Sequence, residues 1–235
     1  DAMLVQRFHD LGVRMISTRT VGYDHIDLDK ARELGMQVGN ATYSPNCVAD
    51  YTLMLMLMSL RKMKRIMQRA ELNDFSLQGI QGRELPNLTV GVVGTGRIGR
   101  SVIRNLTGFG CRILAYDLHE NEEAKACATY VDLDTLYAQS DLITLHMPLT
   151  DDNFHMINES SISQMKDQVV LINTARGGLI DTKALIENIE SGKIGAAGLD
   201  VIENEFGMYY FDRKSDILDK RDLYILRGFP NVIVT

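Results

Sequence analysis

From residue 89 onward, short apolar runs alternate with segments of helical pattern. The runs are rich in valine, isoleucine and leucine and apolar on both faces, as strands of a parallel sheet are when helices cover both sides. Strands are predicted at 89–93, 111–117, 130–132, 141–146, 168–173, 195–200 and 231–234. Helices are predicted between most of them, at 133–138, 160–165 and 182–191. This alternation predicts an α/β fold with a doubly wound parallel sheet, which binds ligands at the carboxyl ends of its strands.

The first part of the chain carries a smaller unit of the same kind. A helix is predicted at 28–34 between two short apolar runs, and Gly35 is a typical residue for ending it. The sheet to which these runs would belong lacks its beginning. We therefore expect residues 1–43 to form part of one domain and residues 44–235 to form a second, larger one.

A long helix is predicted at 45–73, with Ser44 as its N-cap and Pro45 in its first turn. Its first half is methionine-rich and apolar nearly all round, but it contains Asp50 and is too short for a membrane span. One interpretation is a buried connecting helix. The interpretation that we favour is that its methionine-rich face packs against a second copy of the chain, which predicts a homodimer.

Composition and charge narrow the possible partners. The 235 residues are 45% hydrophobic and carry a net charge of −6, which argues against a nucleic-acid or anionic-membrane binder. The three cysteines lie far apart, without a paired motif or a histidine cluster, so neither a disulfide framework nor a metal site is predicted. The first residues show no signal-peptide pattern either. The expected location is the cytoplasm.

The most specific chemical signal is a glycine loop between a strand and a helix. Gly94 permits a tight turn, Gly96 allows backbone N–H groups to approach a pyrophosphate, and Gly99 allows close packing of helix on strand. The N-terminus of the helix adds free N–H donors and a partial positive charge. This pattern predicts a dinucleotide site.

Asp117 supports this interpretation and identifies the nucleotide. It ends the strand that follows the glycine-loop helix, at the position where a carboxylate accepts hydrogen bonds from the adenosine ribose. The next residues are Leu118, His119 and Glu120, so no arginine or lysine directly follows to hold a 2′-phosphate. NAD is therefore favoured over NADP.

Other polar residues follow the remaining strands. Arg176, between a strand and two glycines, could present its guanidinium to a carboxylate, or could simply pair with a helix carboxylate. His146 is more often a structural histidine than a catalyst in such a place. Glu203 and Glu205 come beyond the strand at 195–200, where a solvated acidic loop is the default expectation.

Together these segments resemble the signatures of the D-isomer-specific 2-hydroxyacid dehydrogenases. The matching segments are GTGRIG at 94–99, Asp117, LHMPL at 145–149, INTARG at 172–177 and GLDVIENE at 198–205. Upstream, RTVGYDHID at 19–27 and YSPN at 43–46 resemble the D-lactate dehydrogenase branch of the family, and within it the dehydrogenases of vancomycin-resistance operons. The resemblance implies a Rossmann-like NAD-binding domain and a truncated, flavodoxin-like substrate domain.

The resemblance also implies roles for individual residues. Arg176 would grip the carboxylate of a small 2-keto acid such as pyruvate and polarise its keto group. Glu205 would hydrogen-bond a catalytic histidine. The backbone of Val21 and Gly22 would hold the other side of the carboxylate, and Tyr43 would line the pocket. The NAD would be bordered by Gly94, Gly96, Arg97, Ile98, Gly99, Asp117, Met147, Pro148, Asn153, Thr174, Ala175 and Asp200.

The sequence departs from this pattern in one respect. In the family the catalytic histidine follows the last strand, and this chain ends at Thr235, just before that place. We therefore expect a fragment that binds NAD weakly and has no meaningful turnover alone. Two alternatives stay open: a dehydrogenase for a larger 2-keto acid, since 207–211 is rich in aromatic residues, and a non-catalytic NAD-sensing module on the same scaffold.

Overall fold

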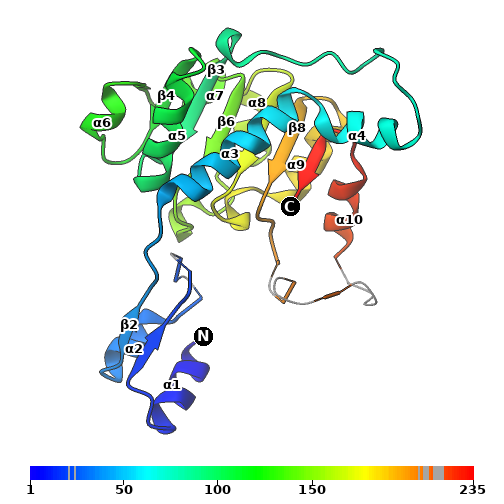
Figure 1. The fold of residues 1–235 in the computed structure, drawn as a ribbon. Helices are drawn as coiled ribbons and strands as arrows, with labels where there is room; N and C mark the ends of the chain where they lie inside the picture. The colour runs from blue at the N-terminus through cyan, green and yellow to red at the C-terminus, as the bar shows by residue number, and fades with distance from the viewer. Residues whose placement is uncertain (21, 24, 206, 209–211, 214–219) are drawn as a thin grey trace. The chain divides into compact units, whose positions relative to one another are not determined.

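The computed structural model describes residues 1–235 except 21, 24, 206, 209–211 and 214–219. The chain forms two compact units, Asp1–Ser44 and Pro45–Thr235, which are described separately (Figure 1). In neither unit do the described residues include a helix long and apolar enough to cross a bilayer.

The described residues of the first unit form two helices and a short parallel strand pair. Its elements are α1 (Ala2–Asp10), β1 (Met15–Ser17), α2 (Leu28–Glu33) and β2 (Gln37–Gly39). Asp27 caps α2, because its side chain accepts the N–H of Lys30 at 2.8 Å. The small core of the unit is built on the buried side chains of Val5, Ala31 and Met36.

The second unit is built on a seven-stranded, all-parallel sheet with the order β5-β4-β3-β6-β7-β8-β9. The strand order reverses direction between β3 and β6, which makes the sheet doubly wound, as predicted. The strands are β3 (Thr89–Val93), β4 (Arg112–Tyr116), β5 (Thr129–Tyr130), β6 (Leu142–Leu145), β7 (Val169–Asn173), β8 (Ile194–Leu199) and β9 (Val232–Val234).

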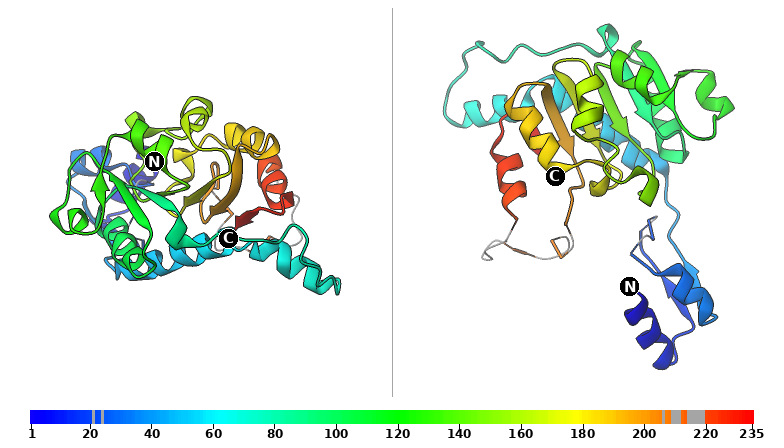
Figure 2. Two further views of the ribbon diagram at one scale, coloured as in Figure 1. Left: turned by 90° about the horizontal axis from the view of Figure 1, so that it is seen from above. Right: turned by 180° about the vertical axis from the view of Figure 1, so that it is seen from behind.

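Helices cover both faces of this sheet (Figure 2). One face packs against α3 (Pro45–Leu60) and α5 (Arg97–Thr107), whose buried residues share a core with the sheet. The opposite face packs against α7 (Leu133–Gln139), α8 (Glu159–Gln164), α9 (Thr182–Glu190) and α10 (Arg221–Gly228). The remaining elements are α4 (Met63–Glu71), α6 (Glu122–Lys125) and the 3₁₀ turns η1 (Leu85–Asn87), η2 (Asp151–Asn153) and η3 (Gly177–Leu179).

The prediction of one continuous helix at 45–73 was wrong. α3 ends at Leu60, and Lys62 has a left-handed backbone with φ 53° before α4 begins. The carbonyl of Leu60 accepts the N–H of Arg83 at 3.0 Å, and the backbone of Gly82 lies against the same carbonyl. The returning chain therefore takes the hydrogen bond that a continued helix would have used.

Tertiary contacts also fix the direction of the second helix. Lys64 in α4 donates from Nζ to the carbonyls of Arg227, Phe229 and Val232, at 2.8, 2.6 and 2.7 Å. These bonds tie α4 to the turn between α10 and β9. Burial and the positive charge of Arg227 hold the pKa of Lys64 below its usual value.

Candidate active site

The residues singled out from the second unit all follow carboxyl ends of its strands. Because the sheet is parallel, these ends share one edge, called here the carboxyl edge. The glycine loop follows β3 and Asp117 follows β4. The segments that begin at His146, Thr174 and Asp200 follow β6, β7 and β8.

The glycine loop has the geometry that the motif requires. Gly94 has φ 96° and donates its N–H to the Tyr116 carbonyl at 2.8 Å, and a Cβ there would collide with the backbone of His146. A Cβ on Gly99 would overlap the carbonyl oxygen of Gly94. A Cβ on Gly96, by contrast, would meet no atom within 4 Å. The loop is thus tightly packed at two glycines and open at the third, which leaves room for a phosphate.

The N-terminus of α5 faces the same opening. Gly96 is the N-cap and has no side chain to bond the first N–H groups of the helix. Arg97 is exposed and Ile98 half-buried at the start of α5. A cradle of this kind fits the diphosphate of a dinucleotide, because the helix end supplies backbone donors and a partial positive charge.

Asp117 is held in place by the glycine loop itself. Its Oδ2 accepts the N–H of Thr95 at 2.6 Å and the Thr95 hydroxyl at 3.1 Å, while Oδ1 accepts the N–H of His119 at 3.1 Å. Partial burial raises the pKa of Asp117, but these hydrogen bonds outweigh it, so the pKa lies below its usual value. The carboxylate is therefore ionised and retains lone pairs to accept ribose hydroxyls.

His146 packs beneath the glycine loop, and its contacts favour the structural interpretation over the catalytic one. Its Nε2 lies 2.9 Å from the Thr144 hydroxyl, and its backbone N–H donates to the Val93 carbonyl at 2.7 Å. Burial lowers the pKa of the His146 ring to about 3, so the ring is neutral near pH 7. A proton acceptor this weak is a poor acid–base catalyst at that pH.

The segment after His146 is held by Asn153. The side chain of Asn153 accepts the N–H of Thr150 at 2.8 Å and donates to the carbonyl of Pro148 at 2.8 Å. Met147 is half-buried and Pro148 exposed. The amide of Asn153 thus fixes the turn that carries the other two predicted cofactor residues.

Arg176 sits on a turn clamped by a residue that we did not single out from the sequence. The fully buried Asn173 donates from Nδ2 to the Arg176 carbonyl at 2.9 Å, and its Oδ1 accepts the N–H of Ala175 at 3.0 Å. Thr174 bonds the Thr52 hydroxyl of α3 at 2.9 Å. The sequence did carry a signal for Asn173, because it is the one amide residue in a strand that is otherwise apolar.

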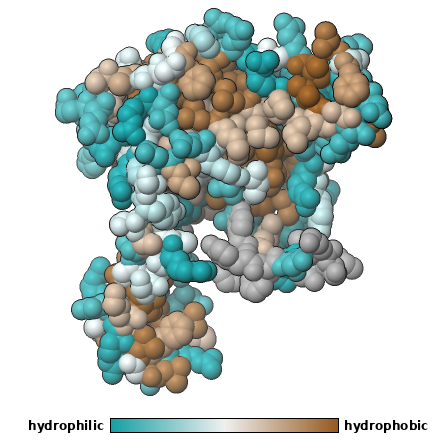
Figure 3. Space-filling model, in the orientation of Figure 1, coloured by the Kyte–Doolittle hydropathy of each residue, from teal (hydrophilic) through white to brown (hydrophobic). Residues whose placement is uncertain are grey.

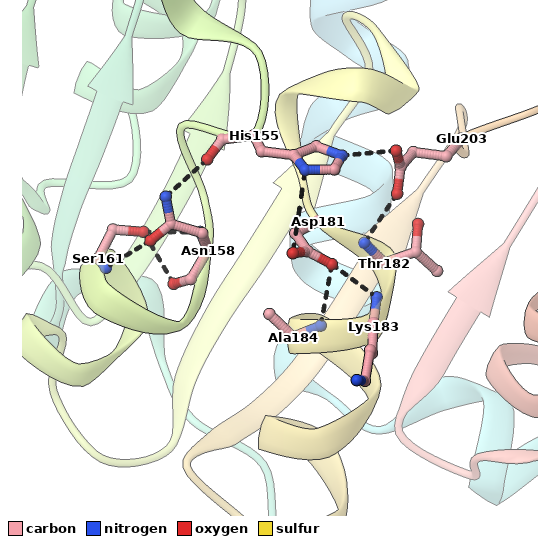
Figure 4. A network of polar contacts seen from close by, with 8 residues as sticks. All are labelled: His155, Asn158, Ser161, Asp181, Thr182, Lys183, Ala184 and Glu203. Carbon is pink, nitrogen blue, oxygen red and sulfur yellow. Dashed lines mark hydrogen bonds and ion pairs between the residues drawn. The ribbon is translucent and has the colours of Figure 1, made fainter.

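The segment after β8 is more ordered than a solvated acidic loop, so that expectation was wrong for Glu203. Its side chain is only 18% exposed and bonds His155 and the backbone of Thr182 (Figure 4). Glu205 accepts the N–H of Ile202 at 2.8 Å. Burial raises the pKa of Asp200, although a hydrogen bond from the Thr235 hydroxyl partly offsets this effect.

The predicted substrate contacts belong to the first unit or to masked positions. Val21 and residues 209–211 of the aromatic segment lie outside the described residues. Gly22 is half-buried, and its carbonyl accepts the hydroxyl of Thr20 at 2.7 Å. The side chain of Tyr43 is exposed.

Comparison with known proteins identifies the family. The NAD-binding domain of the D-isomer-specific 2-hydroxyacid dehydrogenases matches residues 53–235. This chain belongs to that family. An aromatic 2-oxoacid reductase of Clostridium sporogenes is 48% identical over 233 residues, which cover 98% of this chain and 70% of the relative.

Solved structures of the family agree with the fold and the cofactor. A structure of the pyruvate reductase of Chlamydomonas reinhardtii superimposes with a TM-score of 0.89 at 40% identity, covering 100% of this chain and 72% of that one. A D-lactate dehydrogenase of Aquifex aeolicus, complexed with NAD and lactic acid, gives 0.87 at 42% identity, covering 94% and 68%. The Rossmann-like fold, the family resemblance and NAD as cofactor are thereby confirmed.

Proposed function

We propose that this D-2-hydroxyacid dehydrogenase reduces a small 2-keto acid, with pyruvate as the preferred substrate and D-lactate as the product. The observation that carries the proposal is the clamped turn of Arg176 on the same sheet edge as the glycine loop. A cationic fork held on a rigid turn at the cofactor edge is suited to a substrate carboxylate. The lactate-bound relative from Aquifex supports this choice.

Each proposed residue has a defined task. NADH, when bound, supplies the hydride. Arg176 holds the carboxylate of the keto acid and stabilises the negative charge that develops on the keto oxygen. Glu205 keeps a catalytic histidine oriented and protonated, because a neighbouring carboxylate favours the imidazolium form.

The proposed cofactor contacts come from five loops of the carboxyl edge. The glycine loop and the start of α5 bind the diphosphate, Asp117 binds the adenosine ribose, and the later loops border the nicotinamide half. The proposed contact residues are Gly94, Gly96, Arg97, Ile98, Gly99, Asp117, Met147, Pro148, Asn153, Thr174, Ala175 and Asp200.

The first unit is proposed to be part of the flavodoxin-like substrate domain, with Val21, Gly22 and Tyr43 as its substrate contacts. None of the histidines in residues 1–235 follows β9, so we propose that this stretch alone binds NADH weakly and without meaningful turnover. The histidines in question are His9, His25, His119, His146 and His155. Pyruvate reduction by residues 1–235 alone at an ordinary enzyme rate would contradict this proposal.

A larger 2-keto acid is the second candidate substrate. The similarity to an aromatic 2-oxoacid reductase favours it, as does the aromatic composition of 207–211. Rates with pyruvate, 2-ketoisocaproate and phenylpyruvate would decide between the two. A clear preference for the branched or aromatic acid would exclude D-lactate as the main product. Placement near the vancomycin-resistance enzymes stays a prediction.

The decisive test of the function is Arg176→Gln in an active enzyme that contains this sequence. We expect kcat/KM for pyruvate to fall by about 10³-fold, or roughly 4 kcal/mol, because the carboxylate loses its charged partner. NADH affinity should stay within about twofold of the parent, since the cradle is untouched. A non-catalytic NAD sensor would keep its NADH-dependent partner binding in this variant.

Arg112→Gln is the matched control for this charge change. Arg112 begins β4, at the opposite end of the strands, and bonds the Gln139 side chain at 2.9 Å. Its removal should leave kcat/KM unchanged. Equal losses in both variants, or full activity in Arg176→Gln, would contradict the proposal.

We also propose that the enzyme is a homodimer. Met54 and Leu57 on α3 are 39% and 38% exposed, and Leu72, Phe75 and Leu77 after α4 are 81%, 75% and 81% exposed. Figure 3 shows apolar side chains gathered over this side of the larger unit. A second copy would cover this surface. Sedimentation equilibrium should give a dimer, and Leu57→Glu with Phe75→Glu should give a monomer.

A cytoplasmic location is part of the same proposal. Cys47 and Cys127 are exposed free thiols, and Cys111 is half-buried and also free. Free exposed thiols suit a reducing compartment.

A further inference from the structure

Glu203 and His155 form a polar contact that the proposed reaction does not use. Oε1 of Glu203 lies 2.6 Å from Nε2 of His155, and their side chains are 18% and 29% exposed (Figure 4). An ionised carboxylate can only accept, so Nε2 of His155 carries the proton. The other oxygen of Glu203 accepts the N–H of Thr182 at 2.9 Å. Both carboxylate oxygens are thus engaged.

His155 adopts a backbone conformation that costs energy. Its φ is 53°, in the left-handed region that few non-glycine residues occupy, although asparagine, aspartate and histidine occur there more often than others. The neighbouring contacts hold it there: its N–H donates to the Gly178 carbonyl at 2.9 Å, its carbonyl accepts the amide of Asn158 at 2.8 Å, and its ring stacks on Phe154. Strain of this kind persists only where the surroundings impose it and concentrates at functional sites.

The contact joins the loop that carries Glu205 to the turn that carries Arg176. Glu203 lies two residues before Glu205, whose carboxylate accepts the N–H of Ile202. A Cβ on Gly177 would overlap the carbonyl of Ile202, so the Arg176 turn and this loop touch backbone to backbone. His155 bonds the same turn through Gly178. The Glu203–His155 pair therefore holds one loop against the other.

Capping of α9 accounts for only one oxygen of Glu203, which accepts the N–H of Thr182, the first residue of the helix. Asp181 already caps this helix, with Oδ1 accepting the N–H groups of Lys183 and Ala184 at 3.0 and 3.2 Å. Asp181 also lies 3.9 Å from Nδ1 of His155. The other oxygen of Glu203 contacts His155, which lies outside the helix, and this second contact joins two loops.

We propose that Glu203 and His155 are positioning residues that set the place of Glu205 for the reaction. The inference rests on the proposed function, since it assigns to Glu205 the orientation of the catalytic histidine. Removing the pair frees the segment 200–205 from the η3 turn, so Glu205 no longer occupies one position. The glycine loop and Asp117 lie on other strands, and Asp200 stays held by its N–H, which donates to the Asn173 carbonyl at 3.0 Å, so NADH binding is retained.

The test compares Glu203→Ala and His155→Asn in an active enzyme that contains this sequence. Asparagine tolerates the left-handed backbone but is too short to reach Glu203. We expect each variant to lower kcat, counted per NADH-binding site, by at least about tenfold, with NADH affinity within about twofold of the parent. His155→Gln, which can donate to Glu203, should recover most of the loss seen with asparagine.

Glu159→Ala is the matched control. Its carboxylate accepts the amide of Asn188 at 2.6 Å, and it lies on α8, away from the 200–205 segment. Its kcat per site should equal that of the parent. If Glu203→Ala and His155→Asn also keep the parental kcat per site and lose only thermal stability, the pair is merely structural and the proposal is overturned.

A double variant separates this proposal from the proposed function. If Glu203 acts through Glu205, Glu203→Ala should cost less than about threefold in a Glu205→Gln background, where the group it positions is already impaired. A full tenfold loss in that background overturns the positioning role while leaving Glu205 in place. An unimpaired Glu205→Gln overturns the proposed role of Glu205 and with it this proposal, while the proposed function is decided by Arg176→Gln. An impaired Glu205→Gln with normal Glu203→Ala overturns only the positioning role.

Discussion

The two edges of the seven-stranded sheet satisfy their polar groups in different ways. At the amino edge, where the strands begin, charged side chains pair with one another and with strand backbone. Asp141 accepts the N–H of Thr89 at 2.9 Å and contacts both Arg83 and Lys166 at 3.2 Å. Lys193 contacts Asp167 at 2.8 Å. These ion pairs and hydrogen bonds satisfy the charged groups at the start of the strands.

At the carboxyl edge, side chains instead bind the backbone of the turns. Asp117 holds the glycine loop, Asn153 the turn at Pro148, and Asn173 the turn of Arg176. Each turn is fixed in one conformation by a residue of its own neighbourhood, while the N-terminus of α5 keeps backbone donors for a ligand. Polar groups thus stabilise the fold at one edge and shape a binding surface at the other.

The largest effect that separates the two edges is expected from Gly99→Ala. The added Cβ would overlap the carbonyl of Gly94, so the glycine loop has to move away from α5. NADH affinity should fall by at least about tenfold, and the free energy of unfolding by about 2–4 kcal/mol. Fluorescence titration with NADH and urea unfolding measure the two quantities.

Gly108→Ala is the control for this substitution, because Gly108 caps the other end of the same helix. A Cβ there would meet only the Asn105 carbonyl at 3.5 Å, an ordinary contact. NADH affinity should be unchanged. Parental NADH affinity in Gly99→Ala would show that the loop does not form the cradle.

The strands could be predicted from the sequence because their signal is local. A buried parallel strand is a continuous apolar run, and the run predicted at 168–173 is observed as Val169–Asn173. The glycine loop and Asp117 could be predicted for the same reason, because their signal is local too. The turn needs glycines where a side chain would collide, and a carboxylate at the end of the next strand is part of the same motif. Other features depend on residues far away in the chain.

The break after Leu60 and the burial of Glu203 are of this second kind. At the break, the carbonyl of Leu60 accepts the N–H of Arg83, which belongs to a segment further along the chain. Glu203 bonds a histidine 48 residues earlier, and no local pattern predicts such a partner. Sequence patterns therefore predicted the residues at the carboxyl edge better than the contacts that hold its loops together.

An intermediate effect is expected from Asp141→Asn at the amino edge. Partial burial raises the pKa of Asp141, but the Thr89 N–H and the two cations outweigh this effect, so the pKa lies below its usual value. Loss of the charge should lower the free energy of unfolding by about 1–3 kcal/mol at pH 7, with NADH affinity unchanged. Because the folded pKa is depressed, the parent should lose this contribution as the pH falls through that pKa.

Asp167→Asn provides the comparison for Asp141→Asn. Asp167 also pairs with a lysine of this edge, but its side chain is 88% exposed, so its removal should cost less than about 1 kcal/mol. Urea unfolding of both variants measures the difference. A weakening of NADH binding by Asp141→Asn would contradict the separation of roles between the edges.

The smallest expected effect on stability concerns His146, which lies at the carboxyl edge but packs against buried residues of the sheet. The residue is half-buried, yet its Nδ1 is shielded from solvent. Its pKa is lowered to about 3 in the folded chain from 6.5 in the unfolded one, so the unfolded chain binds an extra proton between these values. The free energy of unfolding should therefore fall by about 1–2 kcal/mol from pH 7.5 to 5 through this residue alone.

His146→Gln isolates this contribution, because glutamine can keep the bond to Thr144 without titrating. The variant should show a weaker pH dependence of stability over the same range, measured by urea unfolding followed by circular dichroism. His119→Gln, at an exposed position of the same edge, should leave the dependence as it is in the parent. If His146→Gln and the parent lose stability in parallel, the ring of His146 takes up protons in the folded chain. In that case burial does not keep the ring of His146 neutral, and the ring is reached by solvent in the folded chain.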